Sequence, residues 1–296
     1  MQRIDTATQL CAVIGNPVEH SLSPLIHNAA FEATGLNYVY VAFHVEDVKG
    51  CLAGMRCLRG FRGMSVTIPH KMAVMDYLDE IDPMARHVGA VNTVLNDHGR
   101  LIGSTTDGPG TLRALNDAAV SLAGKRVLFV GAGGAVRSVA FAIAEQAQAD
   151  CVTILGRTPR RVATLVDDLR VRTRTTVNGG SLSDDLSVAM GAHEVIIQGT
   201  PLGMYPHSVN DTAIPKDFFR PGQVVFDMVY RPLKTRLIRE ADAAGCQTML
   251  GVEMLVNQAA LQFETWTGVP APSAVMRSAL VAALAGEEPS ALGPIS

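Results

Sequence analysis

Short apolar runs alternate with amphipathic segments through the first hundred residues of the chain. Short apolar runs bounded by turn residues are typical of strands, and apolar positions spaced by three and four are typical of helices. The runs that predict strands are residues 11–14, 39–43, 63–66 and 90–95. Helices are predicted at residues 24–35, where a proline occupies an early position, and from about residue 47. This part of the chain is therefore predicted to be α/β.

The pattern is sharper from residue 125 onward. A strand predicted at 127–130 is followed by a glycine cluster, by a helix with one apolar stripe, and by a strand at 152–155. This order is typical of a βαβ unit, whose strands are parallel. Runs at 195–197, 224–226 and 248–250 supply further strands of the same sheet. Two helices are predicted after Gly251, at 254–267 and 272–285, and we expect them to pack back onto the first domain.

Composition and charge narrow the functional classes. The chain has 296 residues, which fits about two domains, and a net charge of −3 with Lys and Arg scattered along it. This charge gives no basis for binding nucleic acid or an anionic membrane, so we expect a small-molecule partner. The five cysteines form no CxxC pair, which argues against a disulfide framework and a zinc site. The histidines show no metal-ligand spacing, so no metal is predicted.

Targeting signals are also missing from the sequence. No apolar run approaches the ~20 residues of a membrane span, and the N-terminus lacks the features of a signal peptide. We therefore expect a soluble, cytoplasmic protein with a loose tail at residues 286–296.

A glycine-rich turn follows the strand predicted at 127–130 and opens the next helix. Its sequence is Gly131-Ala132-Gly133-Gly134-Ala135. Glycine permits a tight turn and lets backbone N–H groups approach a pyrophosphate, whose negative charge the helix N-terminus favours. Val136 occupies the place of the third small residue, so we expect looser packing of this helix on the sheet. The alternative is a structural turn without a ligand.

The end of the next strand bears on the choice of cofactor. An acidic residue would hold the ribose 2′-hydroxyl of NAD there, but the sequence places Arg157, Thr158 and Arg161 at this point. Guanidinium groups bind phosphate in bidentate fashion, so these residues suit the 2′-phosphate of NADP. NADP is the predicted cofactor and NAD is less favoured. The alternative is a solvated basic helix start.

The first domain carries a second group of polar side chains. They are Ser21, Ser23, Ser65, Thr67, Lys71, Asn92 and Asp107. Hydroxyls, an amide, an ammonium and a carboxylate together suit a small polyhydroxylated acid better than an apolar or nucleotide substrate. Lys71 closes the run Gly63-Met-Ser-Val-Thr-Ile-Pro-His-Lys71, in which an apolar stretch stops at a proline beside a cation.

These segments resemble the shikimate dehydrogenase family, including its quinate/shikimate dehydrogenase branch. The resemblance continues through three later motifs in family order: Gln198-Gly-Thr-Pro-Leu-Gly-Met204, Asp227-Met-Val-Tyr230-Arg-Pro, and Leu250-Gly-Val-Glu-Met-Leu-Val-Asn-Gln258. It covers almost the whole chain to about Trp266. The resemblance implies an enzyme that interconverts 3-dehydroshikimate and shikimate with NADP.

The resemblance also implies roles for single residues. Lys71 and Asp107 would form the catalytic pair, in which the carboxylate orients the ammonium and a proton passes to or from the C3 oxygen. The residues implied to bind the substrate carboxylate are Ser21, Ser23 and Tyr230. Those implied to hold the ring hydroxyls are Thr67, Asn92, Asp107 and Gln258. Two positions depart from the usual family pattern, since Ser65 and Thr105 each stand where asparagine is common. We expect a hydroxyl contact at Ser65 and fewer hydrogen bonds around Asp107 from Thr105.

The implied fold has two α/β domains. A substrate-binding domain would comprise residues 1–107, completed by helices at 252–296, and a Rossmann-type NADP domain would be inserted at 108–251. The further cofactor contacts implied are Thr200, Met228 and Gly251, of which the last two would form walls near the nicotinamide. The partner expected is a small hydroxylated cyclic carboxylic acid, and the protein would be a monomer or homodimer.

Two alternatives remain open at this stage. Within the same class, the substrate could be quinate or an amino-substituted analogue, and the arginines favour NADP and thus shikimate. In another class, the chain could be a non-catalytic protein that senses a ring acid, although both Lys71 and Asp107 are present.

Overall fold

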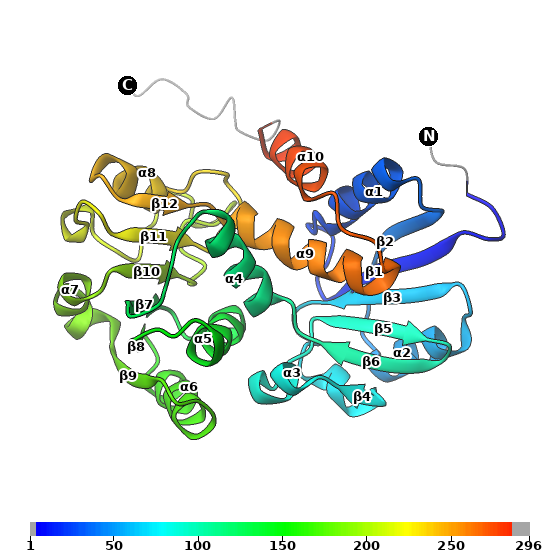
Figure 1. Ribbon diagram of the computed structural model, residues 1–296, viewed down its shortest axis with the longest axis horizontal. Helices are drawn as coiled ribbons and strands as arrows, with labels where there is room; N and C mark the ends of the chain where they lie inside the picture. The colour runs from blue at the N-terminus through cyan, green and yellow to red at the C-terminus, as the bar shows by residue number, and fades with distance from the viewer. Residues whose placement is uncertain (1–3, 286–296) are drawn as a thin grey trace. The chain divides into compact units, whose positions relative to one another are not determined.

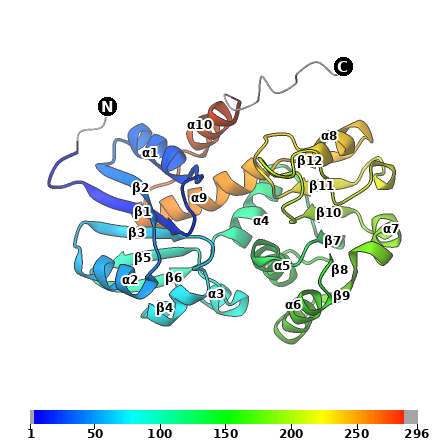
Figure 2. The ribbon, with the colours of Figure 1, turned by 180° about the vertical axis from the view of Figure 1, so that it is seen from behind.

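A computed structural model describes residues 4–285, so the tail predicted at 286–296 lies outside the described residues. The chain divides into two compact units (Figures 1 and 2). The first unit contains the described residues up to Gly110 together with Val256–Leu280, and the second contains Thr111–Leu255 and the described residues from Val281. The predicted fold class, two α/β domains with the second inserted into the first, is confirmed.

The first unit is built on a six-stranded sheet of order β2-β1-β3-β5-β6-β4. Its strands are β1 (Gln9–Gly15), β2 (Tyr38–His44), β3 (Phe61–Val66), β4 (Glu80–Ile81), β5 (Thr93–Asp97) and β6 (Arg100–Ser104). Strands β1, β2 and β3 are parallel, whereas β5 is antiparallel to both β3 and β6. Because β1, β2 and β3 are parallel, their carboxyl ends lie at one edge of the sheet, where the motif ending in Lys71 leaves β3.

Helices cover both faces of this sheet. The helical segments of the first unit are α1 (Ser23–Thr34), α2 (Val48–Cys57), η1 (Ala73–Tyr77), α3 (Pro83–Val88), the start of α4 (Asp107–Asp117), and most of α9 (Gly251–Thr267) and α10 (Ser273–Ala285). Apolar residues of α2 and η1 share a core with β1, β3 and β5. On the other face α9 approaches closely, because a Cβ at Gly63 would collide with Nε1 of Trp266. Glycine in β3 therefore makes room for the indole.

The second unit is a six-stranded parallel sheet of order β12-β11-β10-β7-β8-β9. Its strands are β7 (Arg126–Val130), β8 (Cys151–Gly156), β9 (Thr176–Ser181), β10 (Val195–Gln198), β11 (Val224–Asp227) and β12 (Gln247–Met249). Besides the remaining parts of α4, α9 and α10, its helical segments are α5 (Gly134–Gln146), α6 (Pro159–Arg172), α7 (Leu182–Ala192), η2 (Lys216–Phe218) and α8 (Arg236–Ala243). The single parallel sheet predicted for this region is confirmed.

The structure corrects several predicted strands. The strand predicted at 90–95 begins only at Thr93, because the N–H groups of Ala90 and Val91 donate to Ala85 and Lys71, which belong to no neighbouring strand. The strands β4, β6 and β9 were not predicted. Strand β4 has only two residues, β6 has only two adjacent apolar residues, and β9 is polar with two glycines, so none carries a longer apolar run or a clear alternation.

Candidate active site

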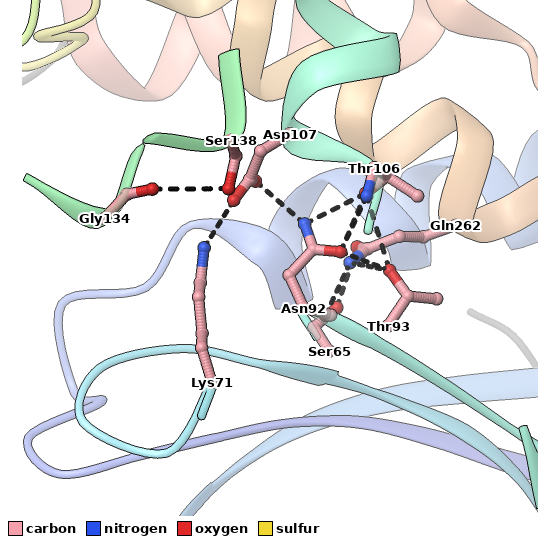
Figure 3. A network of polar contacts seen from close by, with 9 residues as sticks. All are labelled: Ser65, Lys71, Asn92, Thr93, Thr106, Asp107, Gly134, Ser138 and Gln262. Atoms are coloured by element: carbon pink, nitrogen blue, oxygen red, sulfur yellow. Dashed lines mark hydrogen bonds and ion pairs between the residues drawn. The ribbon is translucent and has the colours of Figure 1, made fainter. Parts of the chain in front are cut away.

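Lys71 and Asp107 form a partly buried ion pair in the first unit (Figure 3). Lys71 lies in the segment between β3 and η1, and its Nζ atom is 2.6 Å from Oδ2 of Asp107. The two side chains are 23% and 8% exposed. Asp107 is the first residue of α4, where the helix dipole favours a carboxylate. Sequence reasoning paired these two residues, and the structure brings them into direct contact.

Backbone and side-chain hydrogen bonds hold the segment that carries Lys71. Its carbonyl accepts from the N–H of Val91 at 2.8 Å, and the N–H of His70 donates to the carbonyl of Thr67 at 2.9 Å. The Nε2 atom of His70 lies 2.7 Å from the carbonyl of Val45. The ammonium therefore extends from a turn that is tied to two other parts of the first unit.

Asn92 holds the other oxygen of Asp107. Its Nδ2 donates to Oδ1 of Asp107 at 2.8 Å and to Oγ1 of Thr106 at 3.0 Å. Its Oδ1 accepts from the backbone N–H of Thr106 at 2.8 Å. A backbone N–H can only donate, so it fixes which end of the amide is oxygen and directs the NH₂ group to the carboxylate. Asp107 is thus held by an ammonium on one oxygen and an amide on the other.

A further set of buried side chains lies behind Asn92 (Figure 3). The phenol of Tyr40 donates to Oγ of Ser65 at 2.6 Å, and Ser65 donates to Oε1 of Gln262 at 2.8 Å. Nε2 of Gln262 donates to Oγ1 of Thr93 at 2.9 Å. Sequence reasoning selected Ser65 and missed Tyr40, Thr93, Thr106 and Gln262. Of these, Gln262 could have been found from its spacing, because it follows Gln258 by four residues on the same predicted helix.

The segment before Asp107 is tied down in spite of the departure at Thr105. The N–H of Thr105 donates to Oδ2 of Asp82 at 3.2 Å, while Oδ1 of Asp82 accepts from Ala85 at the start of α3. Thr105 itself is buried. The expected loss of hydrogen bonds at this position is therefore offset by Asp82 on one side and by Asn92 on the other.

The other predicted substrate residues of the first unit lie just before and at the start of α1, after β3 and on α9. Ser23 is the first residue of α1, and its N–H donates to Oγ of Ser21 at 3.3 Å. Thr67 directly follows β3. Gln258 is buried against α4, since a Cβ at Gly110 would lie 2.6 Å from its backbone nitrogen.

Tyr230 belongs to the second unit, in a segment organised by a buried carboxylate. Oδ1 of Asp227 accepts from Val229 N–H at 3.0 Å and from Gln198 at 3.1 Å, and Oδ2 accepts from the hydroxyl of Thr235 at 2.6 Å. Burial raises the pKa of Asp227 to about 6, although the three hydrogen bonds oppose the shift. The segment after β11, which contains Met228 and Tyr230, is thereby fixed at its start.

Gly251 also supports this segment. A Cβ at Gly251 would collide with the carbonyl oxygen of Val229 and would lie 2.7 Å from the nitrogen of Tyr230. Only glycine allows the start of α9 to approach the backbone this closely. Gly251 is therefore better explained as a packing position beside Tyr230 than by chemistry of its own.

The glycine turn borders a small pocket of about 140 Å³ in the second unit. The predicted cofactor residues that line it are Gly131, Ala132, Gly133, Arg157, Thr158, Arg161 and Thr200. Gly131 has a φ of +117°, and a Cβ there would lie 3.1 Å from the carbonyl of Gly199. At Gly133 and Gly134 a Cβ would point into open space, beside the N-terminus of α5. Gly134 and Ala135 form the first turn of that helix.

The looser packing of α5 on the sheet that was expected from Val136 is not observed. It is fully buried, and a Cβ at Gly199 would collide with its Cγ2 atom and would lie 3.0 Å from Sδ of Met228. The extra methyl groups of Val136 are therefore accommodated by glycine on the neighbouring strand end. The prediction missed Gly199, although it stands in the Gln198-Gly-Thr motif.

Two arginines reach the same pocket. Arg157 and Arg161 are exposed, and neither guanidinium has a carboxylate partner among residues 4–285. Thr158 precedes α6, and its carbonyl accepts from the N–H of Arg161 at 3.0 Å. Positive charge, backbone N–H groups and glycine thus converge on one pocket, a donor set that suits a phosphorylated ligand.

Comparison with known protein families covers most of the chain. Residues 13–94 match the shikimate dehydrogenase substrate-binding domain, residues 114–204 match shikimate/quinate 5-dehydrogenase, and residues 251–281 match the shikimate 5′-dehydrogenase C-terminal domain. The chain belongs to the shikimate dehydrogenase family. The family predicted from the sequence motifs is thereby confirmed.

Individual members of this family are similar over nearly their whole length. A shikimate dehydrogenase (NADP⁺) of Moorella thermoacetica is 45% identical over 93% of this chain and 94% of its own. A shikimate 5-dehydrogenase of Listeria monocytogenes, solved with shikimate and NAD, is 36% identical with a TM-score of 0.89 and covers 95% of this chain and 99% of its own. The enzyme of Thermus thermophilus, solved with NADP(H) and shikimate, is 37% identical with a TM-score of 0.84, over 94% and 100%.

Two other features bear on the class of protein. Within residues 4–285, no group of three or more His, Cys, Asp or Glu side chains is placed to hold a metal ion. The helices of the same residues include none that combines the length and apolar character needed to cross a membrane.

Proposed function

We propose that this protein interconverts 3-dehydroshikimate and shikimate with NADP as cofactor. The observation that carries the proposal is the Lys71–Asp107 pair, joined at 2.6 Å and held by Asn92, in a chain of the shikimate dehydrogenase family. Arg157 and Arg161 at the glycine pocket support NADP over NAD. The high similarity to enzymes named shikimate dehydrogenase (NADP⁺) supports the same choice.

The proposed mechanism assigns one proton transfer to Lys71. NADP, when bound, supplies the group that donates or accepts the hydride. Lys71 donates a proton to the C3 oxygen as negative charge develops there during reduction, and removes it during oxidation. A positioned acid or base of this kind typically contributes 10²- to 10⁴-fold in rate. Asp107 keeps the ammonium in place, because both of its oxygens are already fixed by hydrogen bonds.

The remaining polar residues would bind the two ligands. For the substrate carboxylate we propose Ser21, Ser23 and Tyr230, and for the ring hydroxyls Thr67, Asn92 and Gln258, with Ser65 close behind them. For the phosphates we propose the turn from Gly131 to Ala135 and Thr200, and for the 2′-phosphate Arg157, Thr158 and Arg161. Met228 and Gly251 would border the nicotinamide. Residues 1–107 and 252–296 would then form the substrate domain, and 108–251 the NADP domain.

A spectrophotometric panel tests this function. Shikimate, quinate and aminoshikimate are each assayed with NADP and with NAD, using wild type, Lys71→Ala and the control Lys49→Ala, an exposed lysine of α2. We expect the highest kcat/KM for shikimate with NADP, a loss of 10²-fold or more in Lys71→Ala, and no change in Lys49→Ala. Higher kcat/KM for quinate or aminoshikimate would select the alternative substrate. Undiminished turnover in Lys71→Ala would refute the role of this lysine.

The non-catalytic alternative has its own outcome in the same panel. If wild type turns over none of the six combinations but binds shikimate in calorimetry, the chain is a sensor of ring acids. The cytoplasmic location and the monomeric or homodimeric state stay predictions.

A further inference from the structure

The chain of side chains behind Asn92 has an unusual property, because almost all of its members are buried and none carries a charge. Tyr40 and Gln262 are 1% exposed, Thr93 is 0% and Ser65 is 7%. Buried polar groups are costly unless they are hydrogen-bonded, and here each is bonded to the next. This chain of hydrogen-bonded side chains connects strands β2, β3 and β5 with helix α9, and it ends at Asp107.

The direction of every hydrogen bond can be deduced from the Asp107 end. An ionised carboxylate only accepts, so Asn92 must present its NH₂ group to Asp107 and its oxygen to the other side. That oxygen accepts from the hydroxyl of Thr93 at 2.7 Å. Once Thr93 has donated its single proton, the hydroxyl can only accept from its next neighbour. Nε2 of Gln262 is that donor, at 2.9 Å.

The same logic continues to Tyr40. Because Gln262 directs its NH₂ group to Thr93, its oxygen faces Ser65 and accepts the proton of that hydroxyl at 2.8 Å. Ser65 must then accept from Tyr40, which donates at 2.6 Å. Burial raises the pKa of Tyr40, so the phenol keeps the proton that starts the chain. Ser65 consequently has no proton to offer a substrate and can only accept from one.

Gln262 is the member that joins the Asn92 end to the Tyr40 end. Its amide carries donors at one end and an acceptor at the other, and its Nε2 also donates to the backbone carbonyl of Asn92 at 3.1 Å. His27 of α1 confines the chain, because its ring stacks on Tyr40 with centroids 4.4 Å apart. Burial lowers the pKa of His27 to about 3, so the imidazole beside Gln262 is neutral.

We propose that Gln262 is a positioning residue for the Lys71–Asp107 pair. By donating to Thr93 it leaves the Thr93 hydroxyl proton for Oδ1 of Asn92, and by donating to the Asn92 carbonyl it fixes the backbone from which that side chain extends. Together with the backbone N–H of Thr106, these bonds hold the NH₂ group of Asn92 on Asp107. This inference rests on the proposed function, in which Lys71 and Asp107 act together. It adds a residue of α9 that is buried behind Asn92 and Ser65.

A double-mutant cycle tests the proposal. Gln262→Met preserves approximate length and removes every donor and acceptor, so we expect kcat to fall roughly 10-fold while KM for NADP stays within about twofold. In a Lys71→Ala background the same change should lower the residual kcat by less than about twofold, because the pair that Gln262 positions is already broken. A purely structural residue would reduce kcat by the same factor in both backgrounds.

Further variants keep the test decisive. If Gln262→Met does not fold, Thr93→Val replaces it, since valine retains the shape of threonine and removes the hydroxyl that links Gln262 to Asn92. The control is Thr265→Ala, whose hydroxyl donates to the carbonyl of Leu261 on the same helix and touches no member of the chain. It should leave kcat unchanged.

The outcomes separate this inference from the proposed function. Equal losses in the two backgrounds, or no loss of kcat in either variant, would overturn the role of Gln262 while Lys71→Ala still lost 10²-fold or more in kcat/KM. Full activity of Lys71→Ala would instead refute the proposed function.

Discussion

The acid–base pair and the cofactor pocket are held by opposite means. Around Asp107, buried side chains satisfy one another through hydrogen bonds of fixed direction, and the two catalytic candidates are already in contact at 2.6 Å. Around the glycine turn, the backbone forms the surface, a Cβ at Gly133 or Gly134 would meet only open space, and two guanidiniums stand without carboxylate partners in the described part of the chain. The polar groups of the first region bind one another, whereas the two guanidiniums of the second are exposed.

This difference predicts how strongly the activity responds to a substitution in each region. In a buried chain each group depends on its neighbours, so one wrong donor or acceptor affects every bond beyond it. In an open pocket the positive charges act on the ligand one at a time, and water can replace a lost contact. We therefore expect large, coupled effects near Asp107 and smaller, separable effects near Arg157.

The largest effect is expected from Asn92→Asp. This change places a second carboxylate at hydrogen-bonding distance from Asp107, where Nδ2 of Asn92 now donates at 2.8 Å. Two carboxylates sharing one site cannot both ionise without a large cost, so the pair would hold one proton between them. Their single negative charge would then be shared by two carboxyl groups and would no longer rest on Asp107 alone beside Lys71. We expect kcat for shikimate oxidation to fall about 10³-fold.

Asn92→Ala is the matched control for that prediction. It removes the same amide without adding charge, so its loss of kcat should be at least about tenfold smaller. If both variants lose the same activity, repulsion is not the cause and Asn92 contributes only its hydrogen bonds. Circular dichroism of both variants checks that the fold is retained.

The cofactor pocket was predicted more completely from the sequence than the buried side chains behind Asn92, for physical reasons. The βαβ unit and its glycine turn are local, so the apolar runs and Gly131 to Ala135 were sufficient to identify them. The chain behind Asn92 joins residues up to 197 positions apart, from Ser65 to Gln262, and no local pattern reveals such a partner. Lys71 and Asp107 were selected through the family motifs, since a single lysine after a strand indicates little. Gly199 was missed because its role depends on contact with Val136.

The next prediction concerns the pH-dependent stability contributed by Asp227, a buried carboxylate of the second unit, in contrast to Asp107, which is ion-paired with Lys71. Asp227 has a pKa raised from 3.8 to about 6 by burial. Its native state therefore binds a proton more tightly than the unfolded chain, and the stability it contributes is full below about pH 4 and lost as pH rises through about 6. The loss is on the order of 3 kcal/mol in unfolding free energy.

The variant Asp227→Asn tests this pH-dependent contribution to the free energy of unfolding. The amide keeps an oxygen for Val229 and Gln198, and its NH₂ group can donate to Thr235. The variant should gain stability relative to wild type as pH rises from 4 to 7, by up to about 3 kcal/mol in urea unfolding. A difference that is constant with pH would show that Asp227 titrates equally in the folded and unfolded states.

The smallest effects are expected at the arginines of the cofactor pocket. Arg157→Ala and Arg161→Ala should each lower kcat/KM for NADP about 10-fold and leave kcat/KM for NAD within about twofold, because an exposed guanidinium contributes roughly 1–2 kcal/mol through the 2′-phosphate. Arg160→Ala is the matched control, since Arg160 is exposed on the same turn but does not line the pocket. An equal loss in all three variants would mean that general positive charge attracts the cofactor. A loss confined to Arg157 and Arg161, and additive in the double variant, would show that the charges of this pocket act separately, in contrast to the coupled chain behind Asn92.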